Sequence, residues 1–197
     1  MYALAEFERD ILLWIHGNLR FDALTPVMKV LSLMGDKGLF WIALTVVLLL
    51  FRKTRRVGIY CAASMILTFL VVNCAIKPLV ARTRPYDLFP QIQILTHAEH
   101  DFSFPSGHSA NSFAVAWILF RMTKKQYGVP ALILAILIAF SRLYVGVHYP
   151  TDVLAGTAIA IVLAEVCLRQ ISKIERNQRR KKKAARRKKK QSVKRTA

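Results

Sequence analysis

The chain has 197 residues, of which 54% are hydrophobic, and its mean hydropathy is +0.34. Its 30 Lys or Arg residues outnumber its 11 Asp or Glu residues, which gives a formal charge of +19 at pH 7. This length corresponds to one domain, and the apolar content excludes an ordinary soluble protein. Thirteen of the basic residues fall within positions 176–195, where no acidic residue occurs, so the charge is concentrated near the C-terminus.

The N-terminal segment, residues 1–36, is predicted to lie at a membrane interface. Apolar residues recur at helical spacing between Leu4 and Leu19, with charged residues on the opposite side. This pattern is typical of an amphipathic helix that lies in the interface. A second apolar piece, residues 23–34, follows a short break. It either lies in the interface, lengthens the next apolar run, or forms a sixth membrane span.

Five apolar runs follow, and the clearest membrane span is residues 57–76, which has 20 residues without a charge. At about 1.5 Å per residue, this run covers the roughly 30 Å of a bilayer's hydrocarbon core. The other runs are shorter but comparable: residues 38–51, 106–120, 129–147 and 153–168. In a chain this small, five such runs leave too little polar surface to shield them from water, as a soluble protein would require. We therefore predict an all-α fold, an integral membrane bundle of five to six transmembrane helices with an N-terminal amphipathic helix.

The basic joints between the apolar runs predict the orientation of the bundle. Residues 52–56 and 121–125 are strongly basic, and so is the segment after Leu168. Counting spans places all three on one face, which the excess of Lys and Arg makes cytoplasmic. The loop at residues 77–105 and the turn at residues 147–152 then lie on the outer face of a cell's inner (plasma) membrane.

The organisation predicted is an interfacial segment (residues 1–36), a membrane domain (residues 37–172) and a basic tail (residues 173–197). The tail is expected to be disordered, since it has almost no apolar surface to bury. No aromatic residues interleave with its charges and no nucleic-acid-binding module accompanies it, so nucleic acid is not an expected partner. Anionic lipid headgroups at the cytoplasmic surface are the partner that this tail predicts.

Three short motifs at the ends of apolar runs supply what phosphate chemistry needs. Binding needs cations and directed N–H donors, and hydrolysis needs a nucleophile, an acid for the leaving group and stabilisation of the phosphoryl oxygens. Arginine offers forked N–H donors, and lysine offers a point charge. The N-terminus of a helix offers free backbone N–H groups. All candidates lie on the predicted outer face and can converge on one site. They are Lys77, Arg84, Ser106, Gly107, His108, Arg142, His148 and Asp152.

The position of Arg142 indicates an anionic partner. It lies about 18 Å along the apolar run that begins at Val129, and therefore at membrane depth. An unpaired guanidinium there costs at least about 3 kcal/mol, so a negative group should face it. The alternative to a bound phosphate is an internal pair with Asp87, Asp101 or Asp152.

His148 and Asp152 are four residues apart, at the start of the last apolar run. A carboxylate on the first turn of that helix can accept a proton from one imidazole nitrogen, which orients the ring and frees the other nitrogen to attack. The residues alone leave open whether His148 or His108 attacks.

The loop before the second motif resembles a metal cluster in composition only. Its residues His97, Glu99, His100 and Asp101 follow no established ligand spacing. We therefore expect a solvated loop and no metal site.

The pattern Lys77-x6-Arg84-Pro85, Pro105-Ser106-Gly107-His108 and Ser141-Arg142-x5-His148-x3-Asp152 resembles the three-part signature of the type 2 phosphatidic acid phosphatase superfamily, over roughly residues 38–170. The resemblance implies hydrolysis through a phosphohistidine without a metal or other cofactor. It implies that His148 is the nucleophile, Asp152 its orienting partner, and His108 the acid that protonates the leaving group and later activates water. The residues implied to hold the phosphoryl oxygens are Lys77, Arg84, Ser106, Gly107 and Arg142.

A phosphate site at the outer membrane interface indicates a lipid phosphate as substrate. The resemblance implies undecaprenyl diphosphate, hydrolysed to undecaprenyl phosphate, with phosphatidylglycerophosphate and phosphatidic acid as competitors. Two other classes stay open: a lipid phosphotransferase, and a membrane scaffold whose cations only bind anionic lipid. Membrane burial argues against a vanadate-dependent peroxidase. The sequence does not separate the lipid substrates, because the motifs contact only the phosphate, and it leaves the oligomeric state open.

Overall fold

The computed structural model describes the backbone of residues 2–196 and the side chains of residues 4–178 and 180. Every regular element in these residues is helical, so the prediction of an all-α fold is confirmed. The elements in chain order are α1 (Tyr2–Leu19), α2 (Thr25–Gly35), the 3-10 turn η1 (Asp36–Gly38), α3 (Leu39–Leu50), α4 (Arg55–Phe69), the π-helical segment η2 (Leu70–Ile76), α5 (Lys77–Val80), α6 (Pro85–Leu88), α7 (Gly107–Met122), α8 (Lys125–Tyr144) and α9 (Pro150–Thr196).

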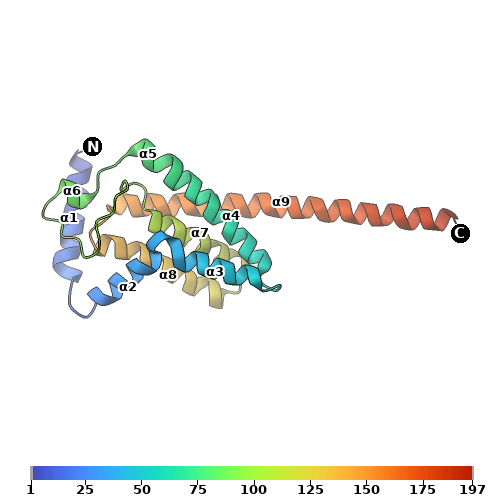
Figure 1. Cartoon of the computed structure of the whole chain (residues 1–197), viewed down its shortest axis with the longest axis horizontal. Helices are drawn as coiled ribbons and strands as arrows, with labels where there is room; N and C mark the ends of the chain where they lie inside the picture. The colour runs from blue at the N-terminus through green and yellow to red at the C-terminus, as the bar shows by residue number, and fades with distance from the viewer. Residues whose placement is uncertain (1, 197) are drawn as a thin grey trace.

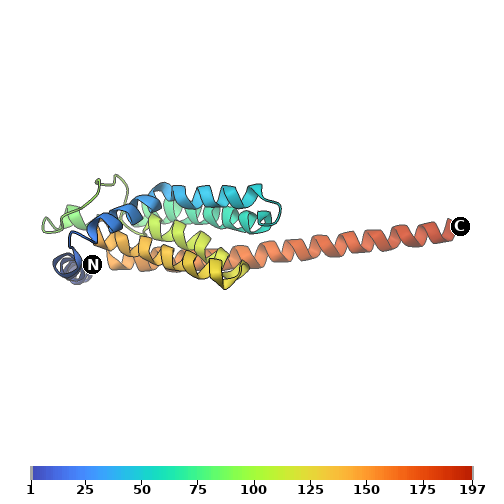
Figure 2. The same ribbon diagram turned by 90° about the horizontal axis from the view of Figure 1, so that it is seen from below.

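α7 lies at the centre of the bundle and packs against α4, α8 and α9 (Figures 1 and 2). Ala110, Ala114 and Ala116 are fully buried, and such small side chains let neighbouring backbones approach closely. Trp41 Nε1 of α3 donates a 2.9 Å hydrogen bond to Ser112 Oγ, which satisfies both polar groups inside the bundle. This packing fixes the position of the first turn of α7, where the site is built.

Among the residues that the structure describes, four helical units are long and apolar enough to span a membrane: Thr25–Leu50, Arg55–Leu88, Lys125–Tyr144 and Pro150–Gln178. Large apolar side chains are exposed along them, among them Ile66, Phe69, Leu70, Ile133, Ile136, Leu154 and Val162. An apolar surface of this extent needs lipid around it, and the chain is a membrane protein. α7 has 16 residues and is shorter than these units, so the total of five to six spans stays a prediction.

The second apolar piece of the N-terminal segment lengthens the next span. α2 continues through η1 into α3, and Thr25–Leu50 forms one apolar unit of 26 residues. Gly38 in η1 has a φ of +70°, a left-handed conformation that glycine adopts without strain. A Cβ there would lie 3.2 Å from the amide nitrogen of Asn111. Of the three alternatives for residues 23–34, the structure favours extension of the following span over a separate sixth one.

α1 crosses the end of the bundle, and the predicted N-terminal amphipathic helix is confirmed (Figures 1 and 2). Leu12 and Ile15 are buried against the other helices, whereas Leu4, Phe7 and Trp14 are more than half exposed. The helix thus presents apolar side chains both to the protein and to its surroundings, as expected of a helix that lies at a membrane interface.

The basic C-terminal segment continues α9 as a helix that projects beyond the bundle (Figures 1 and 2). The structure therefore differs from the prediction of a disordered tail from residue 173. Lys, Arg, Gln and Ala have high helix propensity, and no Gly or Pro interrupts residues 157–196. Charge density alone was an insufficient reason to expect an irregular chain. The domain boundaries at residues 36 and 172 stay predictions.

Candidate active site

The predicted site residues meet at the end of the bundle that α1 crosses. They come from the starts of α5, α6, α7 and α9 and from the last turn of α8. The basic joints at residues 52–56 and 121–125 lie at the opposite end, where α9 projects (Figure 1). The structure thus brings the three motifs to one end of the molecule. The site residues that are at most 9% exposed are Lys77, Arg84, Ser106, His108, Arg142, His148 and Asp152.

Lys77 is positioned by a local irregularity of its helix. The π-helical segment η2 ends directly before it, and Pro78 follows. Proline has no N–H to donate to the carbonyl four residues earlier, so regular α-helical bonding is interrupted here. A Cβ at Gly107 would lie 3.9 Å from Lys77 Nζ and 3.4 Å from Asn73 Oδ1. Glycine at the start of α7 therefore lets the ammonium approach that helix closely.

The N-terminus of α7 offers anion-binding donors beside this lysine. Ser106 is the N-cap, and its Oγ accepts hydrogen bonds from the Ser109 N–H at 3.4 Å and from Ser109 Oγ at 3.0 Å. The Ser106 N–H donates to the Asp152 carbonyl oxygen at 3.0 Å, which ties the start of α7 to the start of α9. The first N–H groups of a helix lack intrahelical partners and favour an anion. The turn that begins at Gly107 is therefore suited to phosphoryl oxygens.

The three cations of the site, which we call the phosphate clamp (Lys77, Arg84 and Arg142), are paired with two carboxylates of the loop between α6 and α7. Glu99 pairs with Arg142 through one oxygen and with Arg84 Nη2, at 2.6 Å, through the other. Asp101 pairs with Arg84 and Lys77. Burial raises the pKa of both carboxyls, but the neighbouring cations outweigh it and the net pKa of each is lowered. Both groups stay ionised at neutral pH and offset two of the three positive charges of the clamp.

These pairs refine one expectation and correct another. The sequence predicts a solvated loop, and His97, His100 and Asp101 are exposed, but Glu99 and Asp101 also reach into the site, with side chains that are 28% and 54% exposed. The internal partner of Arg142 is Glu99, which is none of the three aspartates considered. Within the described residues, no group of three or more His, Cys, Asp or Glu side chains is placed to hold a metal ion. The partly exposed carboxylates are the counterions of the clamp within this chain.

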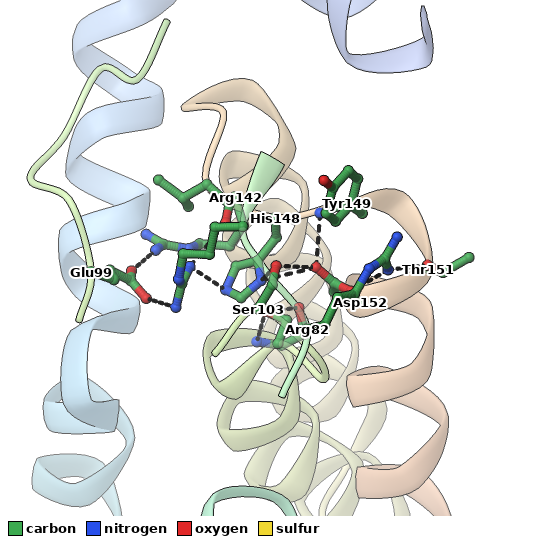
Figure 3. Close-up of polar contacts among 12 residues, drawn as sticks. Arg82, Glu99, Ser103, Arg142, His148, Tyr149, Thr151 and Asp152 are labelled. Atoms are coloured by element: carbon green, nitrogen blue, oxygen red, sulfur yellow. Dashed lines mark hydrogen bonds and ion pairs between the residues drawn. The ribbon is translucent and has the colours of Figure 1, made fainter. Parts of the chain in front are cut away.

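The two nitrogens of the His148 ring face different neighbours (Figure 3). Nε2 lies 3.5 Å from Arg84 Nη1, on the side of the phosphate clamp, and Nδ1 lies 3.4 Å from Asp152 Oδ2. Burial lowers the pKa of this ring to about 4; Asp152 opposes that shift and Arg84 adds to it. The imidazole is therefore neutral at neutral pH, and the nitrogen that faces the clamp has a lone pair for attack.

Asp152 has more partners than the sequence predicts (Figure 3). Its Oδ2 accepts hydrogen bonds from Ser103 Oγ at 2.5 Å and from the Tyr149 N–H at 2.9 Å. Its Oδ1 pairs with Arg82 Nη1 at 2.6 Å. Sequence reasoning missed Ser103 and Arg82. The signal for Arg82 was a third basic residue within the first motif, between the two cations that the motif names.

His108 lines a cavity of about 720 Å³ beside the clamp, together with Lys77. The ring packs closely on α2, since a Cβ at Gly35 would lie 2.6 Å from His108 Cδ2. His148 is only 1% exposed, and Arg84 of the clamp lies against its ring.

An apolar groove of about 350 Å³ adjoins this cavity between α3 and α4. Lys37, Phe69 and Asn111 line both spaces, which therefore lie next to each other. An amphiphile with a charged head and an apolar tail matches this pair of spaces. The apolar residues that line the groove are Ile42, Val46, Leu49, Ala62, Met65, Ile66, Phe69 and Leu70.

The chain belongs to the PAP2 superfamily, whose pattern matches residues 57–176 and so includes all three motifs. It is 35% identical to an undecaprenyl-diphosphatase of Sulfolobus acidocaldarius over 133 residues, which are 68% of this chain and 64% of that protein. It is 36% identical to the undecaprenyl-diphosphatase BcrC of Bacillus subtilis over 101 residues, 51% of each chain. The chain thus spans between half and two thirds of the length of these curated relatives.

A solved structure supports the architecture. The crystal structure of a transmembrane PAP2 type phosphatidylglycerolphosphate phosphatase from Bacillus subtilis superposes with a TM-score of 0.73. The two chains are 28% identical, and the match covers 88% of this chain and 89% of the other. The fold therefore agrees with that of a PAP2 membrane protein along most of the chain.

Proposed function

We propose that this protein is a metal-independent lipid phosphatase that hydrolyses undecaprenyl diphosphate to undecaprenyl phosphate. One observation carries the proposal: the phosphate clamp and two histidines meet at a buried end of a membrane bundle, beside an apolar groove. Two relatives that carry the name undecaprenyl-diphosphatase support the choice of substrate. The two spaces next to the clamp suit a substrate with a phosphate head and a polyprenyl tail.

In the first step, the terminal phosphate displaces Glu99 and Asp101 from the clamp. The cations and the N-terminus of α7 then hold the phosphoryl oxygens and stabilise the charge that develops on them. His148 Nε2 attacks the phosphorus atom, and the bond to the bridging oxygen breaks. His108 donates a proton to that oxygen, so the lipid leaves as its monophosphate.

In the second step, the phosphohistidine is hydrolysed. His108, now neutral, takes a proton from a water molecule, whose oxygen attacks phosphorus and restores His148. Asp152 orients the ring through Nδ1 in both steps. Apart from the substrate and this water molecule, each step uses only side chains and backbone N–H groups of this chain.

The active site is proposed to face the outside of the membrane, with α9 ending in the cytoplasm. The basic joints support this orientation, because they lie at the opposite end of the bundle from the site. A cavity of about 640 Å³ at that end is lined by four arginines, two of which, Arg56 and Arg121, pair with Glu175 and Glu165 in the same lining. The other two, Arg169 and Arg176, and the basic end of α9 suit the anionic lipid headgroups of the cytoplasmic leaflet.

Phosphate release by the purified protein tests the function. The protein in detergent is given undecaprenyl diphosphate, phosphatidylglycerophosphate or phosphatidic acid, each with EDTA present. We expect the highest kcat/KM with undecaprenyl diphosphate and inhibition by vanadate, a mimic of the phosphoryl group. No release from any lipid would leave an anionic-lipid scaffold as the explanation, and release only without EDTA would contradict the metal-independent chemistry.

Phosphatidylglycerophosphate is the second candidate substrate, because the solved structure that covers 88% of this chain is a phosphatidylglycerolphosphate phosphatase. A higher kcat/KM for that lipid in the same panel would transfer the proposal to it. Adding an acceptor alcohol to the assay distinguishes a phosphotransferase. With lipid that is radiolabelled in its phosphate, a phosphotransferase would place the label on the acceptor alcohol. A phosphatase would release the label as inorganic phosphate.

A further inference from the structure

We infer that Glu8 and Arg82 are positioning residues: through Arg82, the carboxylate of Glu8 on α1 holds Asp152 and thereby the His148 ring. This inference rests on the proposed function, in which His148 attacks phosphorus. Neither residue is one of the motif positions, and Glu8 lies outside the residues that match the PAP2 superfamily. The side-chain contacts place both behind the nucleophile.

Arg82 bridges two buried carboxylates. Its Nη1 pairs with Asp152 Oδ1 at 2.6 Å, and its Nη2 pairs with Glu8 Oε2 at 2.5 Å. Nη1 also donates to Thr151 Oγ1 at 2.8 Å, and the guanidinium lies 3.9 Å from the centre of the Tyr149 ring. The planar guanidinium of Arg82 thus has an ion-pair partner at each Nη atom and an aromatic ring against its face. These contacts together fix its orientation. Asp152 Oδ1 is thus fixed, which aims Oδ2 at the His148 ring.

Glu8 is buried although it belongs to a helix at the surface of the bundle. Its side chain is 2% exposed, and both oxygens are satisfied. Oε1 accepts hydrogen bonds from the Thr151 N–H at 2.9 Å and from Thr151 Oγ1 at 2.6 Å. That N–H belongs to the first turn of α9, where no intrahelical partner exists. Glu8 therefore caps the helix that carries Asp152, from another helix.

The charges explain why a carboxylate is needed at position 8. An Asp152–Arg82 pair alone is neutral, and it would do little to stabilise positive charge on the imidazole. Glu8 offsets the charge of Arg82, so the three groups together carry one negative charge next to His148. Positive charge develops on that ring when Nε2 bonds to phosphorus, and a fixed negative charge behind Nδ1 stabilises it. Glu8 and Arg82 thus act on the rate of attack through Asp152.

Glu8→Gln separates this role from simple anchoring of α1. Glutamine has the same shape and keeps an oxygen that can accept from Thr151, but it removes the charge. We expect kcat for lipid phosphate hydrolysis to fall about tenfold, with KM and the vanadate inhibition constant within about twofold of the unchanged protein. Glu6→Gln is the matched control, because Glu6 lies on the same helix, is exposed and should keep full activity.

A double-mutant cycle with Asp152→Asn tests whether Glu8 acts through Asp152. If it does, Glu8→Gln should cause almost no further loss of kcat in the Asp152→Asn protein, because the group it acts through is already altered. If the loss of kcat in the double variant equals the product of the two single losses, the inference is overturned. A kcat of Glu8→Gln within twofold of the unchanged protein would also overturn it.

Two further variants keep the test valid if Glu8→Gln proves unstable. Glu8→Asp retains the charge, so its kcat should be higher than that of Glu8→Gln and close to that of the unchanged protein. If Glu8 only anchored α1 by its shape, Glu8→Gln would be the more active of the two variants. Arg82→Lys retains a cation but loses the fork, and it should lower kcat about tenfold or more with little change in KM. A loss of clamp function would instead raise KM. Failure of phosphate release in the unchanged protein would refute the proposed function itself.

Discussion

The two halves of the active site obtain their counter-charges in different ways. The clamp cations face Glu99 and Asp101, whose side chains are 28% and 54% exposed. Behind His148, the carboxylates of Asp152 and Glu8 are 0% and 2% exposed. We therefore propose that an incoming anion replaces the partners of the clamp, whereas the charges behind the proposed nucleophile are part of the fold.

This difference assigns separate tasks to the two halves. An exchangeable counterion competes with the substrate and should mainly affect KM. A fixed charge that stabilises the reacting imidazole acts in the transition state and should mainly affect kcat. Variants in each half can test this division directly.

Removing the proposed nucleophile has the largest expected effect. His148→Ala leaves the clamp intact but removes the nitrogen that bonds to phosphorus, so phosphate release should fall at least about 10⁴-fold. Radiolabelled lipid phosphate measures the residual rate. His97→Ala, at an exposed loop position, is the control and should keep its activity. Substantial turnover by His148→Ala would show that His148 is not the nucleophile.

Loss of the acid should depend on the leaving group. His108→Ala is expected to lower kcat for the lipid about 10²- to 10⁴-fold, because the bridging oxygen no longer receives a proton. A 4-nitrophenyl phosphate needs no such proton, so attack should proceed and slow hydrolysis of the phosphohistidine should follow. Stopped-flow absorbance should then show a burst of nitrophenolate. Equal slowing of release for both leaving groups, without a burst, would speak against His108 as the acid.

The charge state of His148 gives a pH test. Its pKa is lowered to about 4, so the ring is neutral above that pH and loses its lone pair only below it. Since an unfolded histidine titrates near 6.5, the unfolded chain binds more protons between pH 6.5 and 4, and stability should decrease as the pH falls through that range. Nitrogen-15 NMR of histidine-labelled protein, with His148→Ala for assignment, measures the pKa. A value near 6.5 would contradict the neutral, buried nucleophile.

Altering the exchangeable half should have the smallest effect, and in the opposite direction. Glu99→Gln removes a charge that competes with phosphate, so the KM and the vanadate inhibition constant should each decrease about three- to tenfold. Asp87→Asn is a matched control, because Asp87 is exposed and precedes the same loop. Weaker vanadate binding by Glu99→Gln would show that Glu99 supports the clamp instead of competing for it.

Much of the architecture could be predicted because two independent patterns agree. Apolar runs indicate the helices, and basic joints indicate which ends share a face, so the motifs from residue 77 to residue 152 were expected at one end. The structure brings them together there. Their catalytic roles stay predictions, since they depend on the reaction itself.

The partners of these residues could not be predicted from periodicity. Glu99 and Asp101 lie in an irregular loop, where spacing carries no information about direction. Glu8 lies on an amphipathic helix with apolar neighbours on two sides, so its burial depends on how α1 docks. Arg82 is held by groups from α1 and α9, which are distant in sequence. Contacts of this kind are set by tertiary packing.

The most direct test of the account is to trap the covalent intermediate. Protein mixed with phosphorus-32-labelled undecaprenyl diphosphate, labelled in the terminal phosphate, is quenched in alkali within milliseconds and digested. We predict acid-labile, alkali-stable label on the peptide that contains His148, and none in His148→Ala. Label on His108, or full turnover without any labelled histidine, would contradict it.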